Sequence, residues 1–396
     1  MKHLAPAGTA IGPHTAAFGL LAGLVSKKSH ARLADALARH AGRERAFLMS
    51  TGRAGMSVVL QAMNTLAPGR TEVLVPGYTC YSVAASVKLA GLTPRFVDID
   101  ASTLSPDLAA LERLDTSRVL ALVSANLYGI PNRLRELETF ARSRGIFLLD
   151  DAAQALGATL GGRNVGGFGD AGLYSFDKGK NITSIEGGAI TASGALARAL
   201  DTRCASLVPT SRARTAMTSA KLLVYSTMLR PTAYGLMNKL PLGLGTTRWE
   251  DDYPLGAYSP VLAAVALRLY RRLDQLTQTR ARNARGLIEA LEDLPGIRLP
   301  QIAADATPAW ARFVLFIDDP ARRVRAVAAL NAAGIGATVS YPQALVDVPE
   351  ARALLTEDAV SQEGSRAVAA SVVTLPTHAY VPKDLGARVR AVIARA

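Results

Sequence analysis

The stretch Phe147-Leu148-Leu149-Asp150-Asp151-Ala152-Ala153-Gln154 places two carboxylates directly after a short apolar run. Such a run is typical of a buried strand in a parallel sheet. Ligands of open α/β sheets bind at the carboxyl ends of the strands, which is where Asp151 falls. Because neighbouring side chains on a strand point to opposite faces, only one of Asp150 and Asp151 can face a ligand there.

Outward from this strand, short apolar strands alternate with helical stretches. Strands are expected at residues 73–75, 94–98, 119–123 and 146–149. Helices are expected at residues 31–43, 55–63, 82–91 and 132–144. This alternation predicts an α/β fold with a mostly parallel sheet sandwiched by helices.

The length of 396 residues suits two domains. We expect a large ligand-binding domain over residues 1–255 and a smaller C-terminal α+β domain over residues 256–396. The small domain should begin with one long helix over residues 260–292, followed by a strand at 312–317 and a helix at 321–332.

The composition narrows the class of protein. Hydrophobic residues make up 49% of the chain and charged residues 19%, as in globular proteins. Only Cys80 and Cys204 are present, too few for a disulfide scaffold or a cysteine metal cluster, and they fit a reducing cytoplasm. The five histidines show no ligand spacing, so we expect no metal site. Despite a net charge of +13, the arginines are spread over many expected helices without a recognition motif, so we expect no nucleic-acid partner.

Two apolar segments stand apart from this pattern. Residues 15–25 are apolar but precede no small-residue cleavage site, so a packed or dimer-facing helix is expected instead of a signal peptide. Residues 203–249 contain seven cationic residues and no acidic one: Arg203, Arg212, Arg214, Lys221, Arg230, Lys239 and Arg248. This insertion either embraces a partner subunit or covers an active site, or else it makes peripheral contact with a membrane.

A second polar cluster follows Asp151 along the chain. It reads Tyr174-Ser175-Phe176-Asp177-Lys178-Gly179-Lys180 and lies just before Glu186-Gly187-Gly188. An aspartate, a hydroxyl and a lysine are what a protein needs to hold pyridoxal 5′-phosphate (PLP). The lysine makes the Schiff base, the aspartate keeps the ring nitrogen protonated, and the hydroxyl helps to bind the phosphate. Spacing alone does not choose between Lys178 and Lys180.

Three further stretches are candidates for contacts with PLP. Gly52, Arg53 and Ala54 lie at the start of an expected helix, where free amide groups attract a phosphate, although an ordinary helix cap with a surface arginine fits as well. Cys80 or Tyr81 could cover the cofactor ring, or they could be core residues. Gln154 could hydrogen-bond the phenolic oxygen of the cofactor.

The chain resembles the DegT/DnrJ/EryC1/StrS family, the sugar-aminotransferase branch of fold-type-I PLP enzymes. The resemblance is close over residues 30–200 and looser over 255–396. It rests on Val75-Pro76-Gly77-Tyr78-Thr79, Phe96-Val97-Asp98-Ile99-Asp100, Asn126-Leu127-Tyr128-Gly129, Asp150-Asp151-Ala152-Ala153-Gln154, Gly169-Asp170-Ala171, Ser175-Phe176 and Glu186-Gly187-Gly188.

The resemblance implies roles for individual residues. The family's Schiff-base lysine stands five residues after the serine of Ser-Phe, which is Lys180 here. Asp151 would pair with the pyridine nitrogen, Gln154 would contact the ring side, and Ser175 would bind the phosphate. Dehydratases of the family carry histidine in place of this lysine, so Lys180 favours transamination.

The resemblance also implies a reaction and an assembly. A homodimeric aminotransferase would move an amino group from L-glutamate or L-glutamine to a keto-sugar, usually nucleotide-linked, in polysaccharide or secondary-metabolite biosynthesis. The alternatives are a sugar dehydratase, a PLP enzyme for a non-sugar or lipid-linked carbonyl compound, and a regulatory protein that binds PLP or a sugar nucleotide without catalysis.

Three departures from the family pattern concern the cofactor. The family's phosphate-loop Gly-Thr is Gly52-Arg53, and Cys80 stands in place of the ring-stacking aromatic residue. The family's Gly-x-Asn-x-Arg motif, whose asparagine reaches the phosphate across the dimer interface, is replaced by residues 253–257. We hypothesise that Arg53 supplies the lost phosphate contact from within its own chain, and that Tyr78 or Tyr81 covers the ring.

Overall fold

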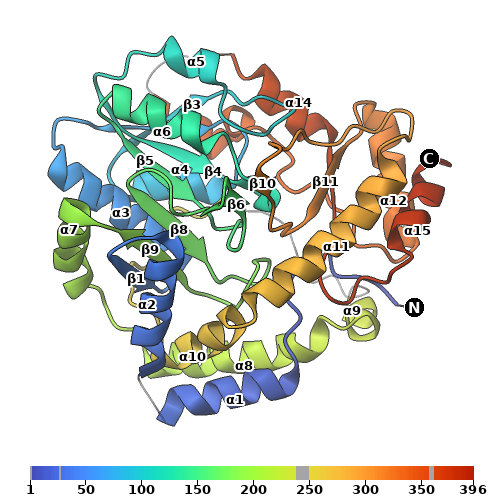
Figure 1. The fold of residues 1–396 in the computed structure, drawn as a ribbon, viewed down its shortest axis with the longest axis horizontal. Coiled ribbons are helices and arrows are strands. Elements are labelled where there is room, and N and C mark those ends of the chain that lie inside the picture. The colour runs from blue at the N-terminus through green and yellow to red at the C-terminus, as the bar shows by residue number, and fades with distance from the viewer. Residues whose placement is uncertain (1, 26–27, 238–248, 356–360) are drawn as a thin grey trace.

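A computed structural model describes residues 2–25, 28–237, 249–355 and 361–396. Its centre is a seven-stranded sheet of order β1-β9-β8-β5-β4-β2-β3 (Figure 1). The strands are β1 (Arg45–Met49), β2 (Glu72–Pro76), β3 (Thr93–Val97), β4 (Val119–Ala125), β5 (Phe147–Asp151), β8 (Ala171–Ser175) and β9 (Gly188–Ala192). The pairs from β3 to β8 are parallel, and β9 pairs antiparallel with both β8 and β1. The expected mostly parallel sheet is confirmed.

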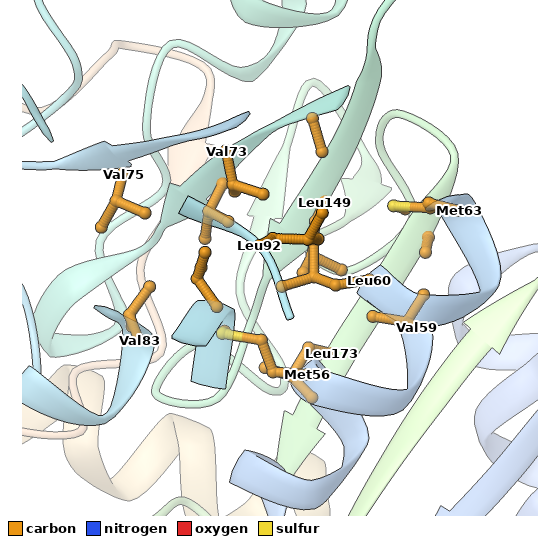
Figure 2. Packing of buried hydrophobic residues seen from close by; sticks show 14 of the residues in the cluster. Met56, Val59, Leu60, Met63, Val73, Val75, Val83, Leu92, Leu149 and Leu173 are labelled. Atoms are coloured by element: carbon orange, nitrogen blue, oxygen red, sulfur yellow. The ribbon is translucent and has the colours of Figure 1, made fainter. Parts of the chain in front are cut away.

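Helices cover both faces of the sheet, as the alternating pattern predicts. One face carries α3 (Gly52–Leu66), α4 (Tyr81–Leu89) and α7 (Gly194–Ala205). The other carries α1 (Pro13–Val25), α2 (Lys28–Ala41), α5 (Leu108–Glu112), α6 (Leu134–Ser143) and α10 (Pro260–Tyr270). In Figure 2, Met56, Leu60 and Met63 of α3 pack toward strand residues that include Leu149 and Leu173.

Strand β5 shows how this packing orients the site. Leu149 belongs to the core beneath α3 and α4, whereas Leu148 belongs to the core beneath α5 and α6. Because side chains alternate along a strand, Asp151 shares the face of Leu149, and Asp150 shares the face of Leu148. The alternation therefore separates two adjacent carboxylates.

The C-terminal part is α+β, but its entry differs from the prediction. The single helix expected over residues 260–292 is two helices, α10 and α11 (Leu273–Leu291), which meet at Arg271 and Arg272. The reason is that the apolar α10 packs on α1 and α2, whereas α11 packs on α15 (Leu385–Ile393). A single straight helix could not make the contacts of α10 with α1 and α2 and also the contact of α11 with α15.

The remaining elements complete the C-terminal part and its surroundings. Strands β11 (Phe313–Phe316) and β12 (Val372–Leu375) pair antiparallel, flanked by α12 (Pro320–Ala332) and α14 (Glu363–Ser371). Shorter pieces are η1 (Leu127–Gly129), η2 (Leu345–Asp347), α13 (Pro349–Arg352) and the small sheet of β6 (Thr159–Leu160), β7 (Arg163–Asn164) and β10 (Ala306–Thr307). Residues near the N-terminus join this part, since the Leu4 N–H donates to the Gly334 carbonyl at 2.8 Å. The domain division at residue 255 stays a prediction.

The described part of the basic insertion contains two helices and the end of a third. Residues 203–237 contain the end of α7, then α8 (Arg212–Met228) and α9 (Pro231–Met237), whereas residues 238–248 lie outside the described part. Helices α1 and α8 lie side by side along one edge of the molecule (Figure 1). None of the described helices is both long and apolar enough to span a membrane.

Candidate active site

A cavity of about 750 Å³ opens at the carboxyl ends of the parallel strands. Seven of the nine candidate residues named from the sequence line it: Gly52, Arg53, Cys80, Asp151, Gln154, Ser175 and Lys180. Ala54 and Tyr81 do not line it. Residues from the ends of β5 and β8 and from the starts of α3 and α4 therefore meet in one place.

Asp151 is the carboxylate that faces the cavity. Its side chain is buried, and it accepts a hydrogen bond from the Ala153 N–H at 2.9 Å. Burial raises the pKa of Asp151, and the Ala153 N–H and the positive charge of Lys180 oppose that rise. The two groups are therefore close enough to interact electrostatically.

Asp150 is used differently. Its oxygens accept from Asn126 Nδ2 at 2.8 Å, from the Gly166 N–H at 2.6 Å and from the Phe168 N–H at 3.1 Å. Burial raises its pKa to about 7, against the effect of these donors. Asp150 thus holds the loop before β8 in place, and it is not among the cavity residues.

The start of α3 and the end of β8 form a tight cradle. A Cβ atom added to Gly52 would lie 3.1 Å from Ser175 Cβ and 3.2 Å from Ser175 Oγ. The small residue therefore lets the first amide groups of α3 approach the Ser175 hydroxyl. Thr51 caps the helix by accepting from the Ala54 N–H at 3.0 Å, so that amide is not free for a ligand. Ala54 is a core residue, fully buried under the helix.

The loop that carries Lys180 is fixed from several sides. Both Lys178 and Lys180 line the cavity. The hydroxyl of Thr9 donates to the Lys180 carbonyl at 2.6 Å, and the Tyr225 hydroxyl of α8 donates to the Lys178 carbonyl at 2.9 Å. Ile185, which ends the loop, has a φ of 75°, an uncommon value for a β-branched residue. The N-terminal segment and α8 thus determine where the backbone of this loop lies.

Arg53 does not point freely into solvent. Its guanidinium lies 4.8 Å from the ring centroid of Tyr253 and forms an ion pair with Glu250 at 2.5 Å. The Tyr253 hydroxyl is in turn within 2.7 Å of Ser86 Oγ and 3.1 Å of Ser57 Oγ. The stretch that replaces the family's Gly-x-Asn-x-Arg motif therefore supplies a platform for Arg53, which sequence reasoning missed.

The other ring-side candidates lie in different places. Cys80 lines the cavity, and its sulfur accepts from Ser82 Oγ at 3.0 Å. Tyr78 and Tyr81 instead pack on Tyr341, and neither is among the residues that line the cavity. Their hydrophobic rings gain from burial between α4 and the C-terminal part. That one of them covers the cofactor ring stays a prediction.

Gln154 lies in the cavity but already has two protein partners. Its Oε1 accepts from the Tyr128 N–H at 3.1 Å, and its Nε2 donates to the Tyr341 hydroxyl at 3.1 Å. These bonds fix the orientation of the amide and connect it to the C-terminal part.

The first half of α8 forms the opposite wall of the cavity. Arg214, Thr218 and Lys221 recur every three to four residues, which places them on one helix face, and all three line the cavity. Arg214 contacts both carboxylate oxygens of Glu186, at 3.3 and 3.0 Å, and the Thr218 hydroxyl donates to Glu186 at 2.9 Å. This contribution was missed from the sequence, where the i, i+4, i+7 spacing was the available signal.

The arrangement combines a buried carboxylate, a hydroxyl beside helix amides, and a lysine near the carboxylate. Such a set can hold an aromatic nitrogen base at one end and a phosphate at the other, with an amine available for covalent and proton-transfer chemistry. A cavity of this volume has room for a second molecule beside such a group.

Comparisons with known proteins agree with this chemistry. The model of the DegT/DnrJ/EryC1/StrS aminotransferase family matches residues 23–227 and 258–394. A UDP-N-acetyl-3-dehydro-alpha-D-glucosamine 3-aminotransferase of Acidithiobacillus ferrooxidans is 35% identical over 38% of this chain and 41% of its own length. A GDP-perosamine synthase of Caulobacter vibrioides is 38% identical over 39% of this chain and 42% of its own. The chain spans about two fifths of the length of these relatives.

Structural similarity extends over the whole chain. One similar structure is the E. coli GDP-4-keto-6-deoxy-D-mannose-3-dehydratase, solved with bound hydrated PLP. The superposition covers 99% of this chain and 100% of the dehydratase chain. The TM-score is 0.76 at 20% sequence identity. The fold-type-I architecture expected from the sequence is confirmed.

Proposed function

The chain belongs to the DegT/DnrJ/EryC1/StrS aminotransferase family, and we propose that it is a PLP-dependent aminotransferase. It moves an amino group from an amino acid, L-glutamate or L-glutamine, to a keto-sugar in polysaccharide or secondary-metabolite biosynthesis. The observation that carries this proposal is the proximity of Lys180 to Asp151 in one shared cavity, where burial raises the pKa of Asp151 and the lysine opposes that rise.

The residues of the cavity fit PLP. Asp151 would keep a proton on the ring nitrogen, and its burial beside a cation suits that role. Ser175 and the amide groups at the start of α3 would bind the phosphate, for which the close approach at Gly52 leaves the backbone accessible. Arg53 would add a charged contact to the phosphate from within its own chain.

Lys180 is the covalent anchor and the acid–base group. When bound, PLP would supply an electron sink, which takes up the electron pair left when the donor's α-carbon loses its proton. Lys180 would hold the cofactor between turnovers, and its freed amine would carry the proton from the donor's α-carbon. Thr9 fixes the Lys180 carbonyl and so limits where this amine can reach.

The acceptor class rests on the relatives. Two of them bear names of nucleotide-sugar enzymes, which supports a nucleotide-linked keto-sugar as the acceptor here. A dehydratase is the alternative raised by the similarity to the E. coli enzyme. The family resemblance implies histidine in place of Lys180 in the dehydratases, so the lysine supports transamination. We further propose a homodimer, as in the family, and a cytoplasmic location, which the two free cysteines support.

The test is the visible absorption spectrum of the purified protein with PLP, titrated with L-glutamate and separately with L-glutamine. One donor should bleach the yellow band as the cofactor becomes aminated, and Lys180→Ala should never form that band. A band that ignores every amino donor would argue for another PLP reaction. No band after addition of PLP would refute the enzyme assignment.

A further inference from the structure

Helix α1 leaves an apolar face in solvent. Its inner face packs closely on α10, because Gly19 and Gly23 lie against Val265 and Val261. Its outer face carries Phe18, Leu21, Leu24 and Val25, of which Leu24 is 72% exposed and Val25 89%. The helix contains no charged residue. Burial of the inner face of α1 holds the helix on the fold, and its outer face has no partner within the described part of the chain.

Helix α8, next to α1, also exposes apolar side chains. Its Leu222 shares a core with Ala16 and Leu20 of α1, which holds the two helices together. On its outer side Met217 is 54% exposed and Val224 57%. We call the six outer side chains Phe18, Leu21, Leu24, Val25, Met217 and Val224 the α1–α8 surface.

The charged residues of the segment that contains α8 have one sign. Between residues 203 and 237 the chain has five cations and no acid. Arg212 and Arg230 are exposed, and neither forms an ion pair within the described part of the chain. An apolar face with unneutralised cations beside it matches an anionic lipid surface, whose headgroups attract the cations while the apolar side chains enter the acyl boundary.

We propose that the α1–α8 surface binds anionic lipid bilayers peripherally. A second copy of the chain is the competing occupant. In a two-fold contact, however, each surface would meet itself, which would bring the cations of α8 close together without acids to neutralise them. A bilayer with anionic headgroups supplies the missing charge.

Lipid binding by the α1–α8 surface would be independent of the proposed function. It would still affect the cavity, because α8 contributes both the outer residues Met217 and Val224 and the cavity residues Arg214 and Lys221. Binding through α8 would place the cavity beside the headgroups.

The experiment is co-sedimentation of the full chain, loaded with PLP, with vesicles of phosphatidylcholine alone or mixed with phosphatidylglycerol. The protein should bind the mixed vesicles at low salt and lose binding as salt rises. Leu21→Asp combined with Leu24→Asp should weaken binding about tenfold or more, because two apolar side chains no longer enter the bilayer. Arg212→Gln combined with Arg230→Gln should weaken it about tenfold, on the mixed vesicles only.

Matched controls lie outside the surface. Val324→Asp on α12 changes another exposed apolar residue, and Arg285→Gln on α11 changes another exposed arginine. Both should leave vesicle binding unchanged, and the thermal midpoints of all variants should be similar. Failure of the unaltered protein to bind mixed vesicles, or equal binding to both vesicle types, would refute the proposal.

Light scattering distinguishes lipid binding from contact with a second copy of the chain. If Leu21→Asp with Leu24→Asp converts a dimer into monomers and leaves vesicle binding unchanged, the α1–α8 surface is a subunit contact and the proposal is wrong. If the variant keeps the oligomeric state and loses vesicle binding, the proposal is supported.

Discussion

The two walls of the cavity are built in different ways. The sheet wall consists of strand ends and the start of α3, where Asp151, Ser175 and Gly52 are fixed by buried backbone. The α8 wall is one face of a half-exposed helix, held at the cavity by the contacts of Arg214 and Thr218 with Glu186. The sheet wall therefore tolerates little change, whereas exposed positions of the α8 wall can vary in charge without disturbing the core.

The largest difference between the walls should appear at Lys180. Lys180→Ala removes the covalent anchor and the proton carrier, so aminotransferase activity should fall by about 10²–10⁴-fold. Steady-state transamination and the cofactor spectrum measure this. Lys178→Ala is the control, since Lys178 lines the same cavity, and it should keep the spectrum. Loss of the band in Lys178→Ala alone would reverse the assignment.

The adjacent carboxylates provide the second test. Asp151→Asn should lower kcat about 100-fold or more, because the ring nitrogen loses its charged partner, while the unfolding midpoint stays near that of the parent. Asp150→Asn should instead destabilise the fold by about 1–3 kcal/mol, because an amide group replaces an oxygen that accepts from backbone N–H groups. Denaturant unfolding and kcat, measured on both variants, check the assignment. Equal effects of the two variants on kcat would show that the strand does not separate their roles.

Arg53 lies where the sheet wall meets the segment after residue 249. Arg53→Thr should weaken PLP binding about tenfold, as expected for loss of one charge-assisted hydrogen bond. Glu250→Gln should not weaken it, because Glu250 competes with the phosphate for the same guanidinium. Equilibrium binding of PLP by fluorescence gives both constants. Unchanged affinity in Arg53→Thr would refute the idea that this arginine replaces a contact from a partner subunit.

The smallest effect is expected on the α8 wall. Lys221→Gln should raise KM for a nucleotide-sugar acceptor about two- to fivefold, the range for an exposed charge pair, and leave kcat and PLP binding unchanged. Arg212→Gln, one outward residue on the same helix, should leave KM unchanged. If Lys221→Gln lowered kcat and not the acceptor affinity, α8 would belong functionally to the sheet wall.

Much of the sheet wall was predictable because its signals are local. The apolar run before Asp151 identified a buried strand, and the strand does end there. The expected helices over 55–63 and 82–91 agree with α3 and α4 to within a few residues at each end, since their apolar residues recur with helical spacing. The break between α10 and α11 escaped prediction because both halves have good helical sequence and only their packing partners differ.

Contacts between distant segments explain the other misses. Tyr253 is 200 residues from Arg53, yet its ring supports that guanidinium. Tyr341 of the C-terminal part packs against both Tyr78 and Tyr81, a contact that the sequence did not predict. No local pattern reports such a partner, because the gain comes from burial between segments that meet only after folding.

The sequence by itself determined the fold class, because periodicity is a property of neighbouring residues. Spacing left two pairs open, Asp150 with Asp151 and Lys178 with Lys180, and the resemblance to a family favoured Asp151 and Lys180. The tertiary structure showed that Asp151 is the carboxylate at the cavity, and it alone decided how Arg53 is held and that α8 contributes to the cavity. The physical reason is the range of the interactions. Alternation along a strand acts over one or two residues, whereas burial and charge pairing act between any segments that packing brings together.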